Sequence, residues 1–231
     1  MTYQAVLEAL DHLKDPDKVT FKEQKFGIIS KNALGIYHQD LKLIAKEVGQ
    51  DNHLALQLFD SGIYEARLLC SKIFNPNDLT EELMEKWVIT FENWEICDSF
   101  CMALFSKSQY ALSKIDEWSD RKPEFEKRAS FATIASYCIA NKTSDNKIFE
   151  AFFPLIIQEA NDDRIYVKKG INWALRNIGK RNVDLHKKAI EVAHEMFQFD
   201  SKSAQWIAKN ALSELQKEGV RCSDYPRYLY R

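Results

Sequence analysis

A chain of 231 residues falls within the size range of one large domain and can bury a substantial core. Its apolar share of 45% and charged share of 29% are those of an ordinary globular protein and argue against a disordered chain. The net charge of −2 hides an asymmetry, because residues 164–231 carry 14 Lys and Arg against 7 Asp and Glu. This excess points to an anionic partner for the C-terminal third, although solvated basic helices explain it equally well.

Several classes of protein are disfavoured by what the sequence lacks. Only 7 Gly and 5 Pro are present, which argues against a fold rich in tight turns, and no apolar run is long enough for a membrane. The five cysteines form no Cys-x-x-Cys pair, and the histidines stand at no zinc-site spacing, so we expect no metal and no cofactor. Residues 1–13 read as an amphipathic helix rather than a secretory signal, so we expect a cytoplasmic monomer with reduced thiols.

Helical periodicity and helix-end signals run through nearly the whole chain. Thr20 and Glu23 have capping-box spacing, and an apolar stripe over 41–48 ends at Gly49, a favourable C-terminal cap. Further helices are expected to begin at residues 51–52 and at Thr80. Pro154 is expected to shorten or kink a helix within 145–160, or to lie near its exposed end. No Gly-, Ser- or Pro-rich linker interrupts the pattern, so residues 1–231 are expected to form a single domain.

An internal repeat is the most informative feature of the sequence. An aromatic-x-x-basic pattern occurs four times, and an apolar residue follows each aromatic by nine positions. The four pairs of aromatic and basic residues are Tyr64 with Arg67, Phe125 with Arg128, Tyr166 with Lys169, and Trp206 with Lys209. The spacings of 61, 41 and 40 residues, with Trp94 splitting the longest interval, predict an all-α solenoid of HEAT or armadillo type.

Stacked repeats place equivalent positions in a row along one surface. The basic residues of the pattern would then form a positive track, giving the solenoid a concave basic face. The alternative interpretation is that these cations fix contacts between helices.

Two helical segments combine aromatic and charged residues on one face. Trp94 and Asp98 are four positions apart on a helix that Asn93 is expected to cap. The other segment, expected over residues 166–181, carries cations around Trp173, namely Lys169, Arg176 and Lys180. An aromatic among three cations suits a surface that contacts phosphate and sugar, since unpaired Lys and Arg are rarely buried. The alternative is that the tryptophans are core residues and that Asp98 is a capping or salt-bridging acid.

These residues resemble a known family, the HEAT-like AlkD-type DNA alkylation repair proteins. The resemblance spans about residues 20–217, and its most specific pieces are Trp-x-x-x-Asp and Lys-Lys-x-x-x-Trp-x-x-Arg. The matching segments are Phe26-Gly27-Ile28, Gly62-Ile63-Tyr64-Glu65-Ala66-Arg67, Trp94-Glu95-Ile96-Cys97-Asp98, Lys127-Arg128-Ala129 and Val167-Lys168-Lys169-Gly170-Ile171-Asn172-Trp173-Ala174-Leu175-Arg176.

The resemblance implies a DNA glycosylase that hydrolyses the N-glycosidic bond of cationic alkylated purines, chiefly 3-methyladenine and 7-methylguanine, in double-stranded DNA. It implies Asp98 as the catalytic carboxylate, Trp94 and Trp173 as its aromatic companions, and Arg128 close to it and to the DNA backbone. The residues that we expect to contact DNA are Arg67, Arg128, Lys168, Lys169, Arg176, Lys180 and Arg181.

Two other functions remain open from the sequence. One is a non-catalytic module that binds damaged or branched DNA, because the family includes relatives that keep the fold without base excision. The other is a protein-binding HEAT scaffold, which an apolar groove in place of the basic track would favour.

Overall fold

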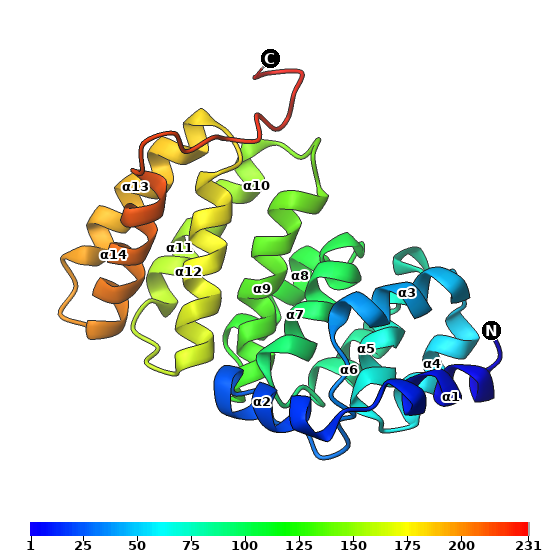
Figure 1. Cartoon of the computed structure of the whole chain (residues 1–231). Helices are drawn as coiled ribbons and strands as arrows, with labels where there is room; N and C mark the ends of the chain where they lie inside the picture. The colour runs from blue at the N-terminus through cyan, green and yellow to red at the C-terminus, as the bar shows by residue number, and fades with distance from the viewer. Residues whose placement is uncertain (231) are drawn as a thin grey trace. The chain divides into compact units, whose positions relative to one another are not determined.

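The computed structural model describes residues 1–230, which divide into two compact units, residues 1–108 and residues 109–230 (Figure 1). Within the described residues all regular secondary structure is helical, as the periodicity predicts. The expectation of a single domain stays a prediction, and each unit is described by itself. No helix among residues 1–230 is long and apolar enough to cross a membrane.

The first unit contains seven α-helices and two short 3₁₀ turns, Pro76–Asp78 and Phe105–Lys107, within its described residues. Its α-helices are α1 (Tyr3–Leu13), α2 (Pro16–Phe26), α3 (His38–Val48), α4 (Asn52–Asp60), α5 (Tyr64–Ile73), α6 (Glu81–Val88) and α7 (Trp94–Ala103).

Most helix ends of the first unit follow the signals in the sequence. α3 ends at Gly49, whose φ of 74° suits a residue without a side chain. The side chains of Asp51, Thr80 and Asn93 accept backbone N–H groups at the starts of α4, α6 and α7.

The capping box expected at Thr20 is wrong. α2 begins earlier, because Asp15 caps it and Pro16 occupies its first position. Thr20 therefore lies inside the helix, and its hydroxyl donates to the carbonyl oxygen of Pro16 at 3.3 Å.

The second unit is also built from helices. They are α8 (Ala111–Ser119), α9 (Glu124–Ala140), α10 (Asn146–Glu150), α11 (Phe152–Glu159), α12 (Ile165–Gly179), α13 (Val183–Phe197) and α14 (Lys202–Leu215). Pro154 falls in the first turn of α11, where its missing N–H breaks no hydrogen bond, so the segment 145–160 is divided as expected. Residues 216–230 follow α14 without a helix.

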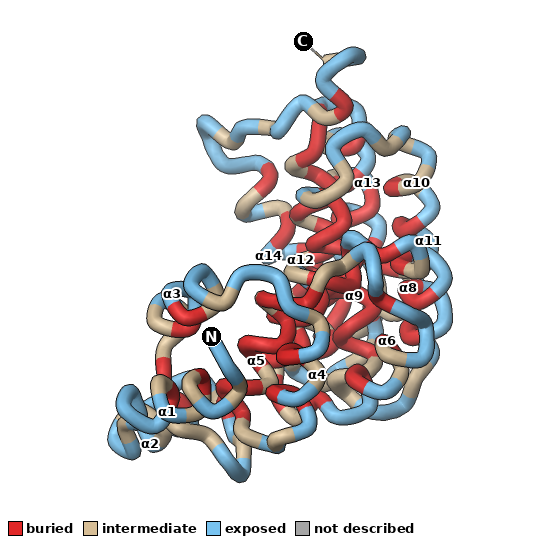
Figure 2. The backbone as a smooth tube through the Cα atoms, turned by 90° about the vertical axis from the view of Figure 1, so that its right-hand side faces the viewer, coloured by how far each residue is buried: buried red, intermediate tan, exposed pale blue. Residues whose placement is uncertain are grey.

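Helix pairs stack within the second unit, as the repeat predicts. α8 packs against α9, α11 against α12 and α13 against α14, while α12 also contacts both α9 and α14. Figure 1 shows α9, α12 and α14 side by side, and Figure 2 shows buried residues along α9 and α12.

The apolar position of the repeat is a core position in both units. The four residues that lie nine positions after the pattern's aromatics are completely buried, namely Ile73, Ile134, Leu175 and Leu215.

Buried amides fix α12 against its two neighbours. Asn172 donates through its side chain to the carbonyl oxygen of Ile207 on α14 at 2.9 Å, and Asn177 donates to that of Ala135 on α9 at 3.0 Å. A buried amide without a partner costs about 1–3 kcal/mol, so these bonds favour one register of the three helices.

Two glycines of α12 differ in how closely other residues approach them. A Cβ on Gly179 would lie 2.9 Å from the Cβ of Ala189 and 2.9 Å from both methyl groups of Leu215. A Cβ on Gly170 would meet the Cβ of Phe131 at 3.4 Å and the side chain of Arg128 at 3.6 Å. The first site is overfilled by one methyl group, whereas the second accepts it at ordinary contact distance.

We therefore expect Gly179→Ala to lower the free energy of unfolding by about 1–3 kcal/mol, because a well-packed core resists added volume. Gly170→Ala is the matched control and should be neutral or stabilising by up to about 1 kcal/mol, since Ala has a higher helix propensity than Gly. Thermal melting followed by circular dichroism compares the two variants. Equal melting temperatures would contradict the packing assigned to Gly179.

Candidate functional site

Trp94 and Asp98 lie on the partly exposed face of α7. Asn93 caps the helix as predicted, with its side-chain oxygen 3.0 Å from the backbone nitrogen of Glu95 and 3.2 Å from that of Ile96. Most of the other α7 residues are buried, whereas Trp94 and Asp98 are half-buried. The indole nitrogen of Trp94 donates to the carbonyl oxygen of Phe26, at the end of α2, at 2.9 Å. This bond gives the indole a fixed orientation.

The buried carboxylate of Glu95 ties the first turn of α7 to three other helices. One of its oxygens lies 2.8 Å from Nζ of Lys22 on α2 and 2.8 Å from the hydroxyl of Tyr64 on α5. The other oxygen lies 3.4 Å from Nε2 of His38, the first residue of α3. Burial acts to raise the pKa of Glu95, but hydrogen bonds from His38 and Lys22 and the Lys22 charge outweigh it and lower the pKa to about 2.

Tyr64 joins Glu95 to the helix cap. Its hydroxyl also lies 2.9 Å from the side-chain oxygen of Asn93, so Glu95 and Asn93 share its single proton. Burial raises the pKa of Tyr64, and the adjacent charge of Glu95 raises it further. Tyr64 therefore stays neutral and remains a hydrogen-bond donor.

We refer to Lys22, His38, Tyr64, Asn93 and Glu95 as the Glu95 cluster. The sequence predicts Tyr64 as a repeat residue and Asn93 as a helix cap, but neither signal indicates the cluster. Its one local signal is an acid two positions after a cap residue, in the first turn of a largely apolar helix. The other partners come from helices distant in sequence.

The structure gives Arg67, the first residue of the expected basic track, partners within the first unit. Its guanidinium forms an ion pair with Glu92 at 2.7 Å and donates to the carbonyl oxygen of Thr90 at 2.9 Å. It also lies over the ring of Phe59, 5.3 Å from the centroid. Arg67 thus holds α5 to the loop after α6 and to Phe59 of α4, a packing role of the kind that the alternative of contacts between helices gives to these cations.

Arg128 is also largely enclosed, at 6% exposure. One of its guanidinium nitrogens donates to the carbonyl oxygen of Tyr166 at 2.6 Å, which ties α9 to the first turn of α12. Gly170 lies beside this side chain, and a Cβ there would meet Cγ of Arg128 at the ordinary contact distance of 3.6 Å.

The first half of α12 carries a partly exposed group of cations and rings. Lys168 lies over the ring of Trp206 on α14, 5.5 Å from the centroid, and the exposed Lys169 lies 5.9 Å from the centroid of the Tyr166 ring. Trp173, one turn after Lys169, is half-buried. No carboxylate of residues 1–230 pairs with either lysine, so both charges stay available to an anion.

The second half of α12 is neutralised by an acid from α14. Glu214 forms ion pairs with Arg176 and with Lys180, the latter at 2.6 Å. The pKa of Glu214 is lowered, because hydrogen bonds from Lys180 and Arg176 outweigh the effect of its burial. DNA phosphates would have to compete with Glu214 for these two cations.

Arg181 lies in a position that does not suit its predicted contact with DNA. It is only 1% exposed, and its guanidinium donates to the carbonyl oxygens of Cys138 and Asn141, both at 2.6 Å. The same group lies 3.9 Å from the centroid of the Phe149 ring. A cation held in this way stabilises the second unit, so we propose no contact between Arg181 and DNA.

The comparisons with known proteins identify the family. The model of the family described as "DNA alkylation repair enzyme" matches residues 6–215, so the chain belongs to this family. The uncharacterized protein Lin0241 of Listeria innocua is 26% identical over 196 residues, which cover 84% of this chain and 85% of the relative. The uncharacterized protein Lmo0209 of Listeria monocytogenes matches over the same length with the same identity.

Solved structures show the same fold. One, described as a member of a new family related to the HEAT-like repeat DNA glycosylases with affinity for branched DNA structures, has a TM-score of 0.75 at 19% identity and covers 96% of this chain and 98% of its own. The crystal structure of AlkD2 from Streptococcus mutans has a TM-score of 0.58 at 20% identity, with 85% and 96% covered. The predicted all-α, HEAT-like repeat fold is therefore confirmed, whereas the concave basic face stays a prediction.

The Glu95 cluster predicts a pH-dependent stability. Because the pKa of Glu95 is lowered from 4.5 to about 2, its ionised form stabilises the fold above pH 4.5, and this contribution is lost as the pH falls towards 2. At pH 7, Glu95→Gln should lower the free energy of unfolding by about 3–5 kcal/mol, since Lys22 then stays buried without a counter-charge. The difference in free energy of unfolding between the unaltered protein and Glu95→Gln should become smaller below pH 4.5.

Urea unfolding at several pH values measures this difference. The matched control is Asp60→Asn, which breaks the exposed ion pair with Lys86 and should cost less than about 1 kcal/mol. A loss in Glu95→Gln as small as that in the control would refute the role assigned to the cluster.

Proposed function

We propose that this protein is a DNA glycosylase that hydrolyses the N-glycosidic bond of cationic N-alkylated purines, such as 3-methyladenine and 7-methylguanine, in duplex DNA. Membership of the DNA alkylation repair family supports this proposal. The observation that carries it is the pair of Trp94 and Asp98 on the accessible face of α7, whose first turn the buried Glu95 cluster fixes.

The proposed chemistry requires a carboxylate but no general acid. An alkylated purine already carries a positive charge, so it leaves as a neutral base when the bond between C1′ and the ring nitrogen breaks. The sugar then develops oxocarbenium character, which an adjacent carboxylate stabilises. In our proposal Asp98 provides this negative charge and accepts a proton from the water whose oxygen bonds to C1′.

Aromatic faces support the same transition state. An indole face near a cation contributes about 0.5–2 kcal/mol, so Trp94 would stabilise the developing charge without reacting. We propose Trp173 as a second aromatic of the site and Arg128 as its basic residue. The bond from Arg128 to Tyr166 would hold that guanidinium in a defined orientation.

Duplex DNA is the proposed partner, and the cations differ in how readily they would reach its phosphates. Lys168 and Lys169 lie against rings, whereas Arg176 and Lys180 are held by Glu214. We therefore propose the two lysines as the main phosphate contacts of the second unit. Arg176 and Lys180 would contribute less, because they exchange one anion for another.

The test is release of 7-methylguanine or 3-methyladenine from methylated DNA. The intact protein should release the base, and Asp98→Asn should reduce the rate by at least about 100-fold, the loss expected when a transition-state charge interaction is removed. Asp60→Asn is the control, because it also replaces an aspartate by its amide, at an exposed site of the same unit, and should keep the full rate. No release by the intact protein would refute the proposal.

A second candidate function is DNA binding without base excision. The observation that favours it is the fold likeness, at a TM-score of 0.75, to a structure described as having affinity for branched DNA. Under this alternative Asp98→Asn leaves the affinity for DNA unchanged, and the affinity for branched duplexes exceeds that for linear duplexes. The base-release assay distinguishes the two functions.

Both functions predict the same hierarchy among the cations of α12. Lys169→Ala should weaken DNA binding and lower the slope of log K against log salt by about 1, as loss of one phosphate contact requires. Lys180→Ala should have a smaller effect, since Glu214 already neutralises that lysine. Fluorescence anisotropy with a labelled duplex over a range of salt concentrations measures both. Equal losses of affinity in Lys169→Ala and Lys180→Ala would contradict this hierarchy.

A further inference from the structure

The C-terminal segment, residues 216–230, carries an aromatic and cationic surface that the proposed function does not use. Backbone N–H groups of Ser223 and Tyr225 donate to the carbonyl oxygens of Lys180 and Arg181 at 2.8 and 3.0 Å. The carbonyl oxygen of Tyr225 accepts from the completely buried side chain of Asn182 at 2.6 Å. The segment is thus fastened where α12 ends and α13 begins.

Two further hydrogen bonds hold the end of this segment. The hydroxyl of Tyr230 donates to Asp184 at 2.6 Å and accepts from the side chain of Asn146 at 2.7 Å. With both its middle and its end attached, the segment holds its outward-facing side chains in place before any ligand arrives. Such preorganisation lowers the entropy cost of binding.

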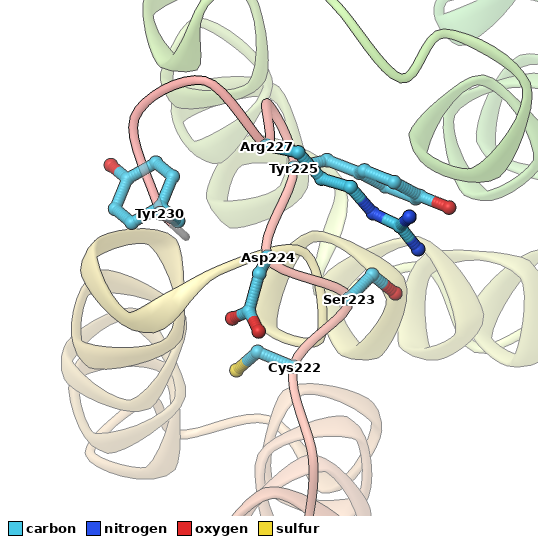
Figure 3. Close-up of a pocket in the computed structure, with 6 residues that line it drawn as sticks. All are labelled: Cys222, Ser223, Asp224, Tyr225, Arg227 and Tyr230. Carbon is cyan, nitrogen blue, oxygen red and sulfur yellow. The ribbon is translucent and has the colours of Figure 1, made fainter.

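Two adjoining hollows lie along the segment and share Tyr225 and Arg227. The larger, about 570 Å³, is completed by Cys222, Ser223, Asp224 and Tyr230, and the smaller, about 250 Å³, by Lys142, Thr143 and Tyr228. Figure 3 shows Tyr225 and Arg227 extending to the same side of the segment, while Tyr230 lies on the other side and the Asp224 carboxylate points towards Cys222.

Cations surround the ring of Tyr225. Lys142, Arg227 and the buried Arg181 lie 5.8, 5.4 and 5.7 Å from its centroid. Lys142 and Arg227 are exposed, and neither forms an ion pair with a carboxylate of the described chain. The smaller hollow therefore combines two rings with two charges that an anion can reach.

The exposed ring of Tyr228 indicates what kind of anionic ligand would use this surface. Tyr228 is 69% exposed, so most of this side chain is open to a ligand. A phosphate alone would leave that ring without a contact. An unpaired base has a free face for stacking on tyrosine, and its backbone phosphate can contact Arg227 and Lys142. In an intact duplex each base is already stacked on its neighbours.

We propose that the surface formed by Lys142, Thr143, Tyr225, Arg227 and Tyr228 binds single-stranded DNA, with a base against the tyrosines and its phosphate near the cations. This surface is additional to the duplex contacts proposed above and would hold an unpaired strand, such as one at a branch or a gap. It also gives Arg181 a role, because that buried guanidinium supports the ring of Tyr225 from within the second unit.

Fluorescence anisotropy of the full chain with a labelled 12-nucleotide oligothymidylate tests the proposal. Tyr228→Ala should raise Kd by about fivefold or more, the range expected from loss of one stacked base. Arg227→Ala should raise Kd and lower the salt slope by about 0.7, the value for one phosphate contact on a single strand. The matched control is Arg221→Ala, an exposed arginine of the same segment that lines neither hollow, and it should change Kd by less than about twofold.

Three outcomes would overturn the proposal. One is no binding of the oligonucleotide by the intact protein, and another is an equal loss in Arg221→Ala and Arg227→Ala, which would reduce the effect to net charge. The third is competition by thymidine monophosphate as effective as that by the oligonucleotide, which would indicate a site for a free nucleotide. Tyr228→Ala should leave base release from methylated duplex unchanged, so the outcome is independent of the proposed glycosylase activity.

Discussion

Burial of the Glu95 carboxylate is the constraint on which the arrangement of the first unit depends. A buried charge costs several kcal/mol unless cations and hydrogen-bond donors compensate it. The donors lie on different helices, Lys22 on α2, His38 on α3 and Tyr64 on α5, so α7 can satisfy its glutamate only where all three converge. The partly exposed face of α7, with Trp94 and Asp98, takes its position from this buried requirement.

The second unit holds its helices by close approach and by hydrogen bonds to carbonyl groups. Gly179 lets α12 approach the residues around it to distances that no Cβ would allow. Arg181 follows the end of α12, donates to carbonyl oxygens at the C-terminal end of α9 and lies over the ring of Phe149. The result is a firm base for the surface of α12 and for the C-terminal segment fastened to it.

Periodicity predicts the helices and their core positions because each signal is local. The apolar residues at the ninth position are buried in all four repeats, and Gly49, Asp51, Thr80 and Asn93 end or begin helices as expected. The capping box expected at Thr20 is absent, because Asp15 and Pro16 form a stronger helix start five positions earlier. The partners of the charged residues are not local: Glu92 follows Arg67 by 25 positions and Glu214 follows Arg176 by 38. No pattern within one helix reports such a pairing.

These pairings change what the charge asymmetry means. A cation paired with a carboxylate or enclosed by carbonyl groups adds little to the field that an approaching polyanion meets, whereas a cation on a ring keeps its net charge. The first kind includes Arg176, Lys180 and Arg181, although they are among the positive charges of α12 and of the residues that follow it. Lys168, Lys169 and Arg227 belong to the second kind, each beside an aromatic ring. Of these six cations, the three that keep their charge lie beside rings, a pairing that suits nucleic acid because a nucleotide presents a flat base and a phosphate together.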